Sequence, residues 1–334
     1  MKVTIQQLAE LTGVSPATVS KVIHNYPDVG EETKEKIMQA IKETGYAPKQ
    51  NTYNKKAKTI GVIYAVGADI KHPFFIDVID SFAKEIGEDG YNLLFFSSKE
   101  ETEEATYDYL ARCLEVDVAG CIIIGGDEIQ HYVKELDQSN IPCIGVDIEL
   151  TGDSSGYLMS DNKNIGKKVV EHFYLLGHRE IAFIGGLSSM TVGLLRKRGF
   201  YQAMAEFGLD VQEQWVEYGD FKESSGYEAM KRLLQKQGPL PSALFAAGDL
   251  MAIGAIQAIK EHGLSVPEDI AVIGCDDIDL SRYVTPALTT IHQNTQKIGK
   301  LAAHMLEDFI NGSTGSSSVM VDSDLVIRSS CGNK

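Results

Sequence analysis

The sequence lacks the marks of several large protein classes. Its 334 residues include five cysteines, scattered and without a CxxC pair, so neither a disulfide framework nor a metal site is expected. No apolar run approaches the roughly 20 residues of a membrane span. The N-terminal segment is interrupted by Gln6, Gln7 and Glu10, so we expect no signal peptide. The composition predicts a cytoplasmic protein with reduced thiols and no membrane partner.

Catalytic motifs are also missing. The sequence has no GxSxG, HExxH, GxxxxGK[ST] or GxGxxG after a strand, and its eight histidines show no metal-ligand spacing. Asp276 and Asp277 are adjacent acids, but neighbours on an extended segment point apart. We therefore expect no enzyme and no cofactor.

Charge is distributed unevenly along the chain. The net charge is −16, yet residues 1–59 contain nine lysines and six acidic residues, a net +3, which leaves −19 for the remainder. An acidic surface repels DNA phosphates, so any DNA contact is expected within the N-terminal segment. The length predicts two domains and a smaller unit, and 43% hydrophobic residues suffice for packed cores.

Residues 4–44 carry the pattern of three short helices. Thr4 is an N-cap candidate before apolar residues at helical spacing over 4–11, and Gly13 supplies a turn. Ser15 and Pro16 then begin a second helix, and a third is expected over about 31–44. This order predicts an all-α helix-turn-helix domain, although a plain three-helix cap has the same pattern.

From Thr59 onward, buried strands alternate with amphipathic helices, which predicts an α/β body of two doubly wound parallel-sheet lobes. In the first series we expect strands over 59–66, 91–98, 120–126 and 142–148, with helices over 74–90, 101–116 and 128–138. In the second series we expect strands over 179–186, 215–219, 242–248 and 269–277, with helices over 163–177, 191–207, 223–237 and 250–263. Ligands in such folds lie beyond the carboxyl ends of the strands.

The amino-acid sequence closely resembles those of the lactose/galactose repressor (LacI/GalR) family of bacterial regulators. The resemblance is carried by VTIQQLAELTGVSPATVSKVIHN and VGEETKEKIMQAIKETGYAPK near the N-terminus, and by HPFF, LGHREIAFIGG, RKRGFYQAM, GDFKESSGYEAM and VIGCDDIDLSRYVTPALTTIHQ in the body. It covers almost the whole chain. It implies a DNA-binding domain over 1–48, a linker over 49–58, and a ligand-binding and dimerisation domain over 59–334 that is similar to periplasmic sugar-binding proteins.

The resemblance also implies where the ligand-binding domain divides. Lobe one is expected over 59–160 plus 291–318, and lobe two over 161–290 plus 319–334. No heptad pattern follows residue 319, so no coiled-coil tail is expected.

In this family the start of the second helix enters the major groove of DNA. The positions that match its base readers are Pro16, Ala17 and Lys21, of which Lys21 can donate to guanine and Ala17 can touch a thymine methyl. Positions that match phosphate contacts are Thr4, Ser15, Thr18, Ser20 and Asn25. Each of these polar side chains is also explained as a helix cap or an exposed residue.

The linker departs from the family. Members usually carry a hinge helix of the type N-x-x-A-R-x-L, whose leucine enters the minor groove and bends the DNA. This linker has no leucine, so Tyr53 is its one large apolar side chain, and Lys55 and Lys56 suit a groove or a solvated linker equally well. The sequence therefore does not decide whether a hinge helix forms. It also leaves the alternative that the protein is a ligand-binding module with a non-functional DNA-binding domain.

Effector-binding positions of the family map onto Phe74, Arg196, Phe221 and Asp276. An aromatic face, a forked donor and a carboxylate suit a sugar ring or a base. Alternatives are core packing for the phenylalanines, a surface ion pair for Arg196 and a strand-end carboxylate for Asp276. Weaker effector candidates are Asp147, Asp161 and Asp249, the last of which we interpret first as a helix cap.

The sequence thus predicts a ligand-responsive transcription repressor of carbohydrate-utilisation genes. A homodimer would bind a pseudo-palindromic operator, because one small domain makes too few contacts for specificity. We expect a saccharide as effector, since Met190 stands where purine-responding members have an arginine. A purine or a phosphorylated coregulator protein is the alternative input.

Overall fold

A computed structural model describes residues 4–23, 29–44, 58–64, 72–96, 108–125, 129–186 and 190–332. The chain divides into two compact units, Met1–Lys56 and Ala57–Lys334, which we call the N-terminal unit and the C-terminal unit. None of the helices in these described ranges is long and apolar enough to cross a membrane.

The N-terminal unit contains the three predicted helices, α1 (Ile5–Thr12), α2 (Pro16–Ile23) and α3 (Glu31–Thr44). Thr4 and Gln7 form a reciprocal capping box at the start of α1. Gly13 ends that helix with a φ of 70°, a left-handed conformation that glycine adopts without strain. The three helices bury one small core, made of Leu8, Ala9, Val19, Val22 and Ile37. The helix-turn-helix prediction is confirmed.

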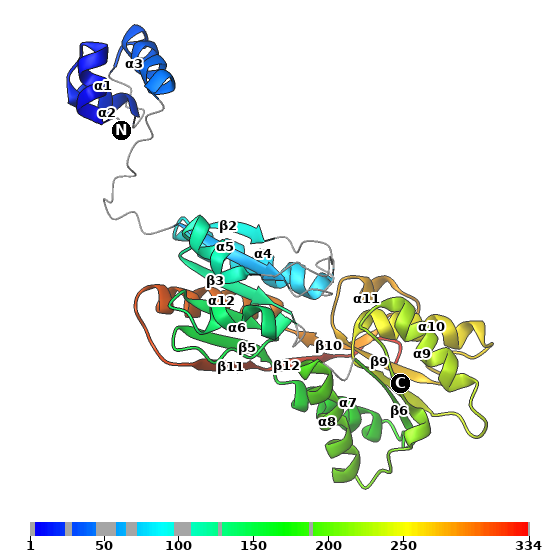
Figure 1. Cartoon of the computed structure of the whole chain (residues 1–334). Helices are drawn as coiled ribbons and strands as arrows, with labels where there is room; N and C mark the ends of the chain where they lie inside the picture. Colours follow the sequence, from blue (N-terminus) through cyan, green and yellow to red (C-terminus); the bar gives the residue numbers. More distant parts are fainter. Residues whose placement is uncertain are drawn as a thin grey trace. The chain divides into compact units, whose positions relative to one another are not determined.

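The C-terminal unit is built from two six-stranded sheets, one in each lobe (Figure 1). The sheet of the first lobe has the order β11-β5-β4-β3-β1-β2, and all its strand pairs are parallel. Its strands are β1 (Thr59–Tyr64), β2 (Asn92–Phe96), β3 (Gly120–Ile124), β4 (Cys143–Val146), β5 (Ser155–Ser160) and β11 (Ser317–Val321). Its helices are α4 (Pro73–Glu88), α5 (Tyr109–Val116), α6 (Gln130–Asp137) and α12 (Thr295–Ile310).

Apolar residues of the first sheet alternate between its two faces. Ile60 and Val62 of β1 pack in the core that includes α4 and α12, whereas Ile63 packs in the core that includes α5 and α6. A parallel sheet that is covered by helices on both faces needs apolar residues at nearly every strand position. Because such runs are easy to recognise, most of these strands could be predicted from the sequence.

The sheet of the second lobe has the order β12-β10-β9-β8-β6-β7, with β12 antiparallel to β10 and the other pairs parallel. Its strands are β6 (Ile181–Gly185), β7 (Val216–Tyr218), β8 (Ala243–Ala246), β9 (Ala271–Asp276), β10 (Thr289–Gln293) and β12 (Ser323–Val326). Its helices are α7 (Asn162–Leu175), α8 (Thr191–Glu206), α9 (Glu223–Leu234), α10 (Asp249–Glu261) and the short α11 (Leu280–Tyr283), and a 3-10 turn, η2 (Glu213–Trp215), precedes β7.

The chain crosses between the lobes three times, and two crossings differ from the expected boundaries. β10 pairs with β9, so residues 291–293 belong to the second lobe, and the chain enters the first lobe only at α12. β11 pairs with β5 as far as Val321, beyond the expected boundary at 318. Strand pairing decides these boundaries, and the sequence does not show which partner a strand will choose. β5 also escaped prediction, because SGYLMS lacks β-branched residues.

Candidate functional site

The N-terminal unit presents one exposed side of α2. Pro16, Ala17 and Lys21 are exposed, whereas Val19 and Val22 of the same helix are buried in the core. The predicted base-reading residues therefore lie on a surface that the fold leaves open, at helical spacing. This is the geometry of a helix that can enter a major groove.

Two of the proposed phosphate contacts also serve as helix caps. Ser15 Oγ accepts a hydrogen bond from the Thr18 backbone N–H at 3.1 Å and lies 2.8 Å from Thr18 Oγ1. Thr4 Oγ1 accepts from the Gln7 N–H at 3.3 Å. Ser20 is half-buried on α2. The remaining candidates, Asn25 and the linker residues Tyr53, Lys55 and Lys56, lie outside the described residues.

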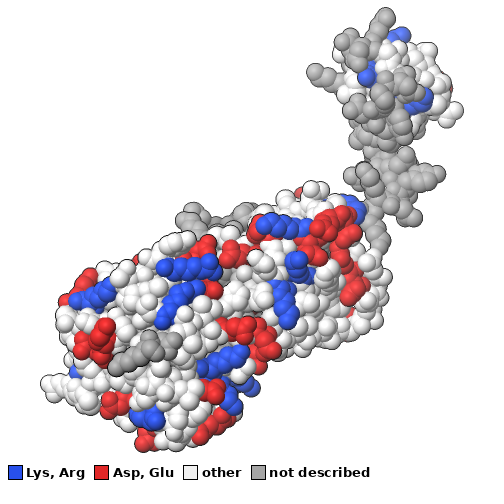
Figure 2. Space-filling view, turned by 180° about the vertical axis from the view of Figure 1, so that it is seen from behind, with Lys and Arg blue, Asp and Glu red and all other residues white. Residues whose placement is uncertain are grey.

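Acidic and basic side chains are interspersed on the C-terminal unit. Figure 2 shows both signs mixed over the described part of one face of this unit, without a continuous basic stripe there. A face with interspersed charges, on a part of the chain whose net charge is −19, offers no track for a phosphate backbone. This agrees with DNA contact through the N-terminal unit.

A second candidate site lies where the two lobes of the C-terminal unit meet, and Asp276 is at its centre. This residue ends β9 with a φ of 131°, and its carboxylate is buried. Oδ1 accepts a hydrogen bond of 2.6 Å from Gln293 Nε2 and lies 3.7 Å from the Arg196 guanidinium. Oδ2 has no hydrogen-bond partner among the described residues. An unsatisfied buried carboxylate oxygen indicates a position that a ligand donor completes.

Arg196 lies on α8 and is buried, which rules out the alternative of a surface ion pair. Its Nε donates to Asn162 Oδ1 at 2.8 Å, and its Nη1 donates to the Ala247 carbonyl at 2.5 Å. These bonds hold the guanidinium beside Asp276. The fixed positive charge balances one of the carboxylates at the junction.

Asp147 follows β4 of the first lobe and is buried at the same junction. Its pKa is raised to about 6, mainly by burial and also by the neighbouring charge of Asp276, while Arg196 acts in the opposite direction. Its φ is 58°, a left-handed conformation, and its Oδ1 has no partner among the described residues. Asp147, a weaker candidate on sequence grounds, therefore belongs to the same group as Arg196 and Asp276.

Phe221 lies in a cradle of glycines. It has a φ of 67°, and its ring is so close to Gly186 that a Cβ there would lie 2.2 Å from Cζ. A Cβ on Gly248 would lie 3.2 Å from Phe221 Cδ1 and 3.6 Å from Asp276 Oδ2. The ring and the unpartnered carboxylate oxygen thus both border Gly248. An aromatic face at this place suits a ring-shaped ligand.

Phe74 is buried on α4 in the core of the first lobe, with its ring centroid 5.3 Å from that of Phe75. This burial fits its alternative interpretation as core packing, and an effector role for Phe74 stays a prediction. Phe75, one residue later, is half-buried and lies against the ring of His72, with centroids 5.8 Å apart.

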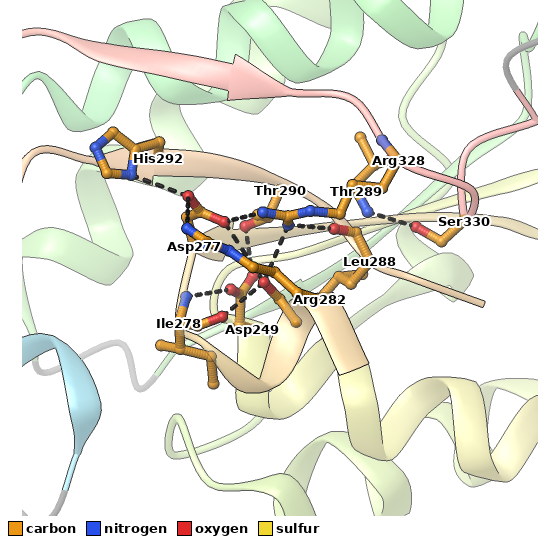
Figure 3. A network of polar contacts seen from close by, with 11 residues as sticks. Asp249, Asp277, Ile278, Arg282, Leu288, Thr289, Thr290, His292, Arg328 and Ser330 are labelled. Atoms are coloured by element: carbon orange, nitrogen blue, oxygen red, sulfur yellow. Dashed lines mark hydrogen bonds and ion pairs between the residues drawn. The ribbon is translucent and has the colours of Figure 1, made fainter. Parts of the chain in front are cut away.

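Asp249 and Asp161 have structural roles. Asp249 Oδ2 accepts from the Ile278 N–H at 3.0 Å, and Oδ1 accepts from the Thr290 hydroxyl (Figure 3). Burial raises the Asp249 pKa well above its usual range. Asp161 is the N-cap of α7, where it accepts from the Asn164 N–H at 3.2 Å.

A second network of polar contacts surrounds Asp277, the residue that follows Asp276. The carboxylate of the next residue, Asp277, lies 3.0 Å from His292 Nδ1 and accepts from Arg328, whose Nη1 also donates to the Leu288 carbonyl at 2.7 Å (Figure 3). Asp277 has a φ of 58°. Consecutive residues of β10, His292 and Gln293, thus hold the consecutive aspartates 277 and 276, which keeps the strained strand end in place.

Four residues near the junction escaped prediction from the sequence, namely Tyr64, His72, Ser160 and Gln293. Each has a buried side-chain polar atom without a hydrogen-bond partner among the described residues. Tyr64 and Ser160 end β1 and β5, at the carboxyl edge of the first sheet, and burial raises the Tyr64 pKa to about 12. Position near a strand end was an available signal for Tyr64 alone, because β5, which Ser160 ends, escaped prediction.

These two sites define a DNA-binding protein with a small-molecule-binding unit attached. Residues 4–49 match the family described as bacterial regulatory proteins, lacI family, and residues 170–331 match a periplasmic binding protein-like domain. The chain belongs to the LacI family of bacterial regulatory proteins.

Relatives along the whole chain agree with this assignment. The chain is 36% identical over 310 residues to the HTH-type transcriptional repressor PurR of Serratia proteamaculans (strain 568), covering 92% of this chain and 90% of the relative. It is 34% identical over 331 residues to PurR of Proteus mirabilis (strain HI4320), covering 98% and 96%. The protein is therefore a DNA-binding transcription repressor and not an enzyme.

Solved structures match over the same length. The lac repressor dimer bound to operator and the anti-inducer ONPF superposes with a TM-score of 0.74 at 26% identity, covering 99% of both chains. The complex of the transcriptional regulator CelR with cellobiose superposes with a TM-score of 0.73 at 29% identity, covering 98% of this chain and 100% of that one. Operator DNA and a small-molecule effector are thus the partners of this family fold.

Proposed function

We propose that the protein is a homodimeric repressor, acting in the cytoplasm on carbohydrate-utilisation genes, whose effector is a neutral saccharide bound at the lobe junction. The observation that carries the proposal is the set of unpartnered buried acceptors, which includes Asp276 Oδ2, Asp147 Oδ1 and Gln293 Oε1. Atoms that only accept hydrogen bonds need a ligand rich in donors, and a sugar presents several hydroxyl groups. The cellobiose bound to CelR supports this class of ligand.

The charges at the junction favour a neutral ligand over a phosphorylated one. Two buried carboxylates, Asp147 and Asp276, face one buried cation, Arg196. An added phosphate would bring further negative charge into a site that already has more carboxylates than cations, at a high desolvation cost. The Phe221 ring then provides the apolar surface for one face of the sugar ring.

On the N-terminal unit, we propose that Pro16, Ala17 and Lys21 read base edges and that the cap hydroxyls of Thr4 and Ser15 meet phosphates. The proposal is supported by the exposure of the base-reading positions on one side of α2. A hydroxyl that accepts from a backbone N–H still has its own proton to donate to a phosphate oxygen, so capping and phosphate contact are compatible.

Exposed apolar side chains of neighbouring elements support a homodimer. Ile76 of α4, Leu280 and Tyr283 of α11 and Phe95 of the edge strand β2 are exposed, Tyr283 by 79%. The pKa of Asp77 on α4 is raised mainly by burial and next by the charge of Asp279, which precedes α11. The starts of α4 and α11 therefore lie close together. A two-fold dimer would cover these side chains with the same surface of a second copy.

Thermal unfolding of the full chain tests the effector class. Glucose, galactose, cellobiose, hypoxanthine and guanine are each added in large excess, and a compound at about 100 times its Kd stabilises by about 2.7 kcal/mol. That corresponds to a rise in Tm of roughly 5–10 °C. We expect a sugar to produce it, and the same sugar to change the affinity of the chain for operator DNA.

Two variants make this test specific. Asp276→Asn, which loses a carboxylate acceptor with little change of shape, should lose the shift in Tm. Asp161→Asn makes the same change at a helix cap, where asparagine functions equally well, and should keep the shift. Stabilisation by a purine and by no sugar would replace the saccharide assignment, and no stabilisation by any of the five would refute it.

A further inference from the structure

His72 has a side chain that its own helix does not use. The residue is the N-cap of α4, and its carbonyl accepts from the N–H groups of Phe75 at 3.0 Å and Ile76 at 3.3 Å. Its imidazole makes no capping hydrogen bond, and Pro73 occupies the first helical position. The ring lies edge-on against Phe75 and is only 14% exposed. The backbone thus builds the helix, and the imidazole is turned toward the lobe junction.

The group that faces this imidazole comes from the other lobe. His72 Nε2 lies 3.9 Å from Asp276 Oδ2, the carboxylate oxygen that has no hydrogen-bond partner among the described residues. The separation is too long for a direct hydrogen bond, yet a single oxygen atom can lie about 2.8 Å from each of them, within hydrogen-bond distance of both. A hydroxyl group can donate to the carboxylate while it accepts from the Nε2–H of the histidine.

We propose that His72 is a further effector-contact residue, and that it and Asp276 hold one effector hydroxyl between the two lobes. The inference rests on the proposed function and adds to it a specificity-determining residue from the first lobe. The other oxygen of Asp276 is held by Gln293, on the strand from which the chain crosses into the first lobe.

A hydroxyl at this position has a consequence for regulation. It is bound fully only in the lobe arrangement that brings His72 and Asp276 together, because its two partners belong to different lobes. An effector with this hydroxyl therefore has a higher affinity for that arrangement, and differential affinity is what shifts a conformational equilibrium. An otherwise identical sugar without the hydroxyl binds more weakly and shifts the equilibrium less.

The pairing can be tested without any effector, because the fold offers a matched control. Two histidines face two adjacent aspartates, His72 with Asp276 and His292 with Asp277. Long-range ¹H–¹⁵N spectra report the ring nitrogens of both histidines in the full chain. We expect Asp276→Asn to shift the His72 Nε2 resonance and Asp277→Asn to shift that of His292 Nδ1, each leaving the other histidine unchanged. An unchanged His72 resonance in Asp276→Asn overturns the proposal.

The contact with the effector is measured with glucose and cellobiose by calorimetry. His72→Leu should weaken binding about tenfold, the effect of losing one well-formed hydrogen bond to an otherwise unsatisfied group. His72→Gln places an N–H near the same position and should restore part of the loss. His304→Gln, at an exposed position of α12 outside the site, should leave the affinity within twofold.

Monodeoxy glucoses identify the shared hydroxyl. For one of them the loss of affinity relative to glucose should be about tenfold larger in the wild type, where the bonds to both His72 and Asp276 are lost, than in His72→Leu, where only the bond to Asp276 is left to lose. Equal losses in both proteins for every deoxy sugar would overturn the role of His72. If none of glucose, galactose and cellobiose stabilises the wild type, the saccharide assignment fails, whereas the resonances still decide whether His72 pairs with Asp276.

Discussion

Replacing Asp147 by asparagine should stabilise the protein at neutral pH. The carboxyl group is buried and one of its oxygens has no partner, so ionisation costs more in the folded chain than in the unfolded chain. Its pKa rises from 3.8 to about 6 on folding. At 1.36 kcal/mol per unit this difference costs about 3 kcal/mol when the group is charged. Asparagine keeps the shape without the charge, and it tolerates the left-handed φ of 58° at this position.

The pH dependence of this effect has a defined sign. Below about pH 4 the carboxyl is protonated in both states, and wild type and Asp147→Asn should be equally stable. A raised pKa in the folded state means that stability is lost as pH rises through that pKa. The wild type should therefore fall behind the variant between about pH 4 and 6 and stay about 3 kcal/mol less stable above it.

Urea unfolding of both proteins at pH 4, 5, 6 and 8 measures this difference, because all other titrating groups are common to the two. A difference that does not change with pH, or a variant less stable than the wild type at pH 8, would refute the assignment of a strained, buried charge. The same variant should bind a saccharide more weakly, since an amide replaces an acceptor. Retention of a costly carboxylate is the trade of stability for function expected at a binding site.

Three further predictions concern the two sites and the dimer. Lys21→Ala should weaken operator binding by about 1–3 kcal/mol and relax sequence choice in a binding assay on operator variants, whereas uniform weakening on all DNA would indicate a phosphate contact. Arg196→Ala should abolish the effector response and leave operator binding in place. It should also lower the free energy of unfolding by about 3–5 kcal/mol, because it leaves buried acids without their cation. An effector affinity equal to that of the wild type would contradict the assignment of the site. Tyr283→Glu should shift the sedimentation coefficient toward that of a monomer, and an unchanged dimer would place the interface elsewhere.

The pattern of the sequence predicted most of the elements because each is specified locally. Thr4, Gly13 and Pro16 mark helix ends through their own backbone and hydrogen-bonding preferences, and they bound α1 and the start of α2. Apolar runs bounded by glycine or proline likewise marked buried parallel strands. β5 was missed since Ser155–Ser160 has little strand preference of its own and is held by its neighbours β4 and β11.

The family resemblance supplied the effector candidates Arg196, Phe221 and Asp276. The structure brings these three residues together at the lobe junction, and their role in binding an effector stays a prediction. Phe74 and Phe75 are adjacent and identical in type, so which of them packs in the core depends on how α4 is turned against the sheet.

The sequence by itself determined a helix-turn-helix domain and an α/β body, and it named candidate residues for a ligand site. Only the tertiary structure decided that β10 joins β9, which places Gln293 on Asp276, and that the first lobe brings His72 to the same carboxylate. The physical reason is distance along the chain. Local preferences act over a few residues, whereas these contacts depend on strand pairing and lobe packing between segments far apart in the sequence.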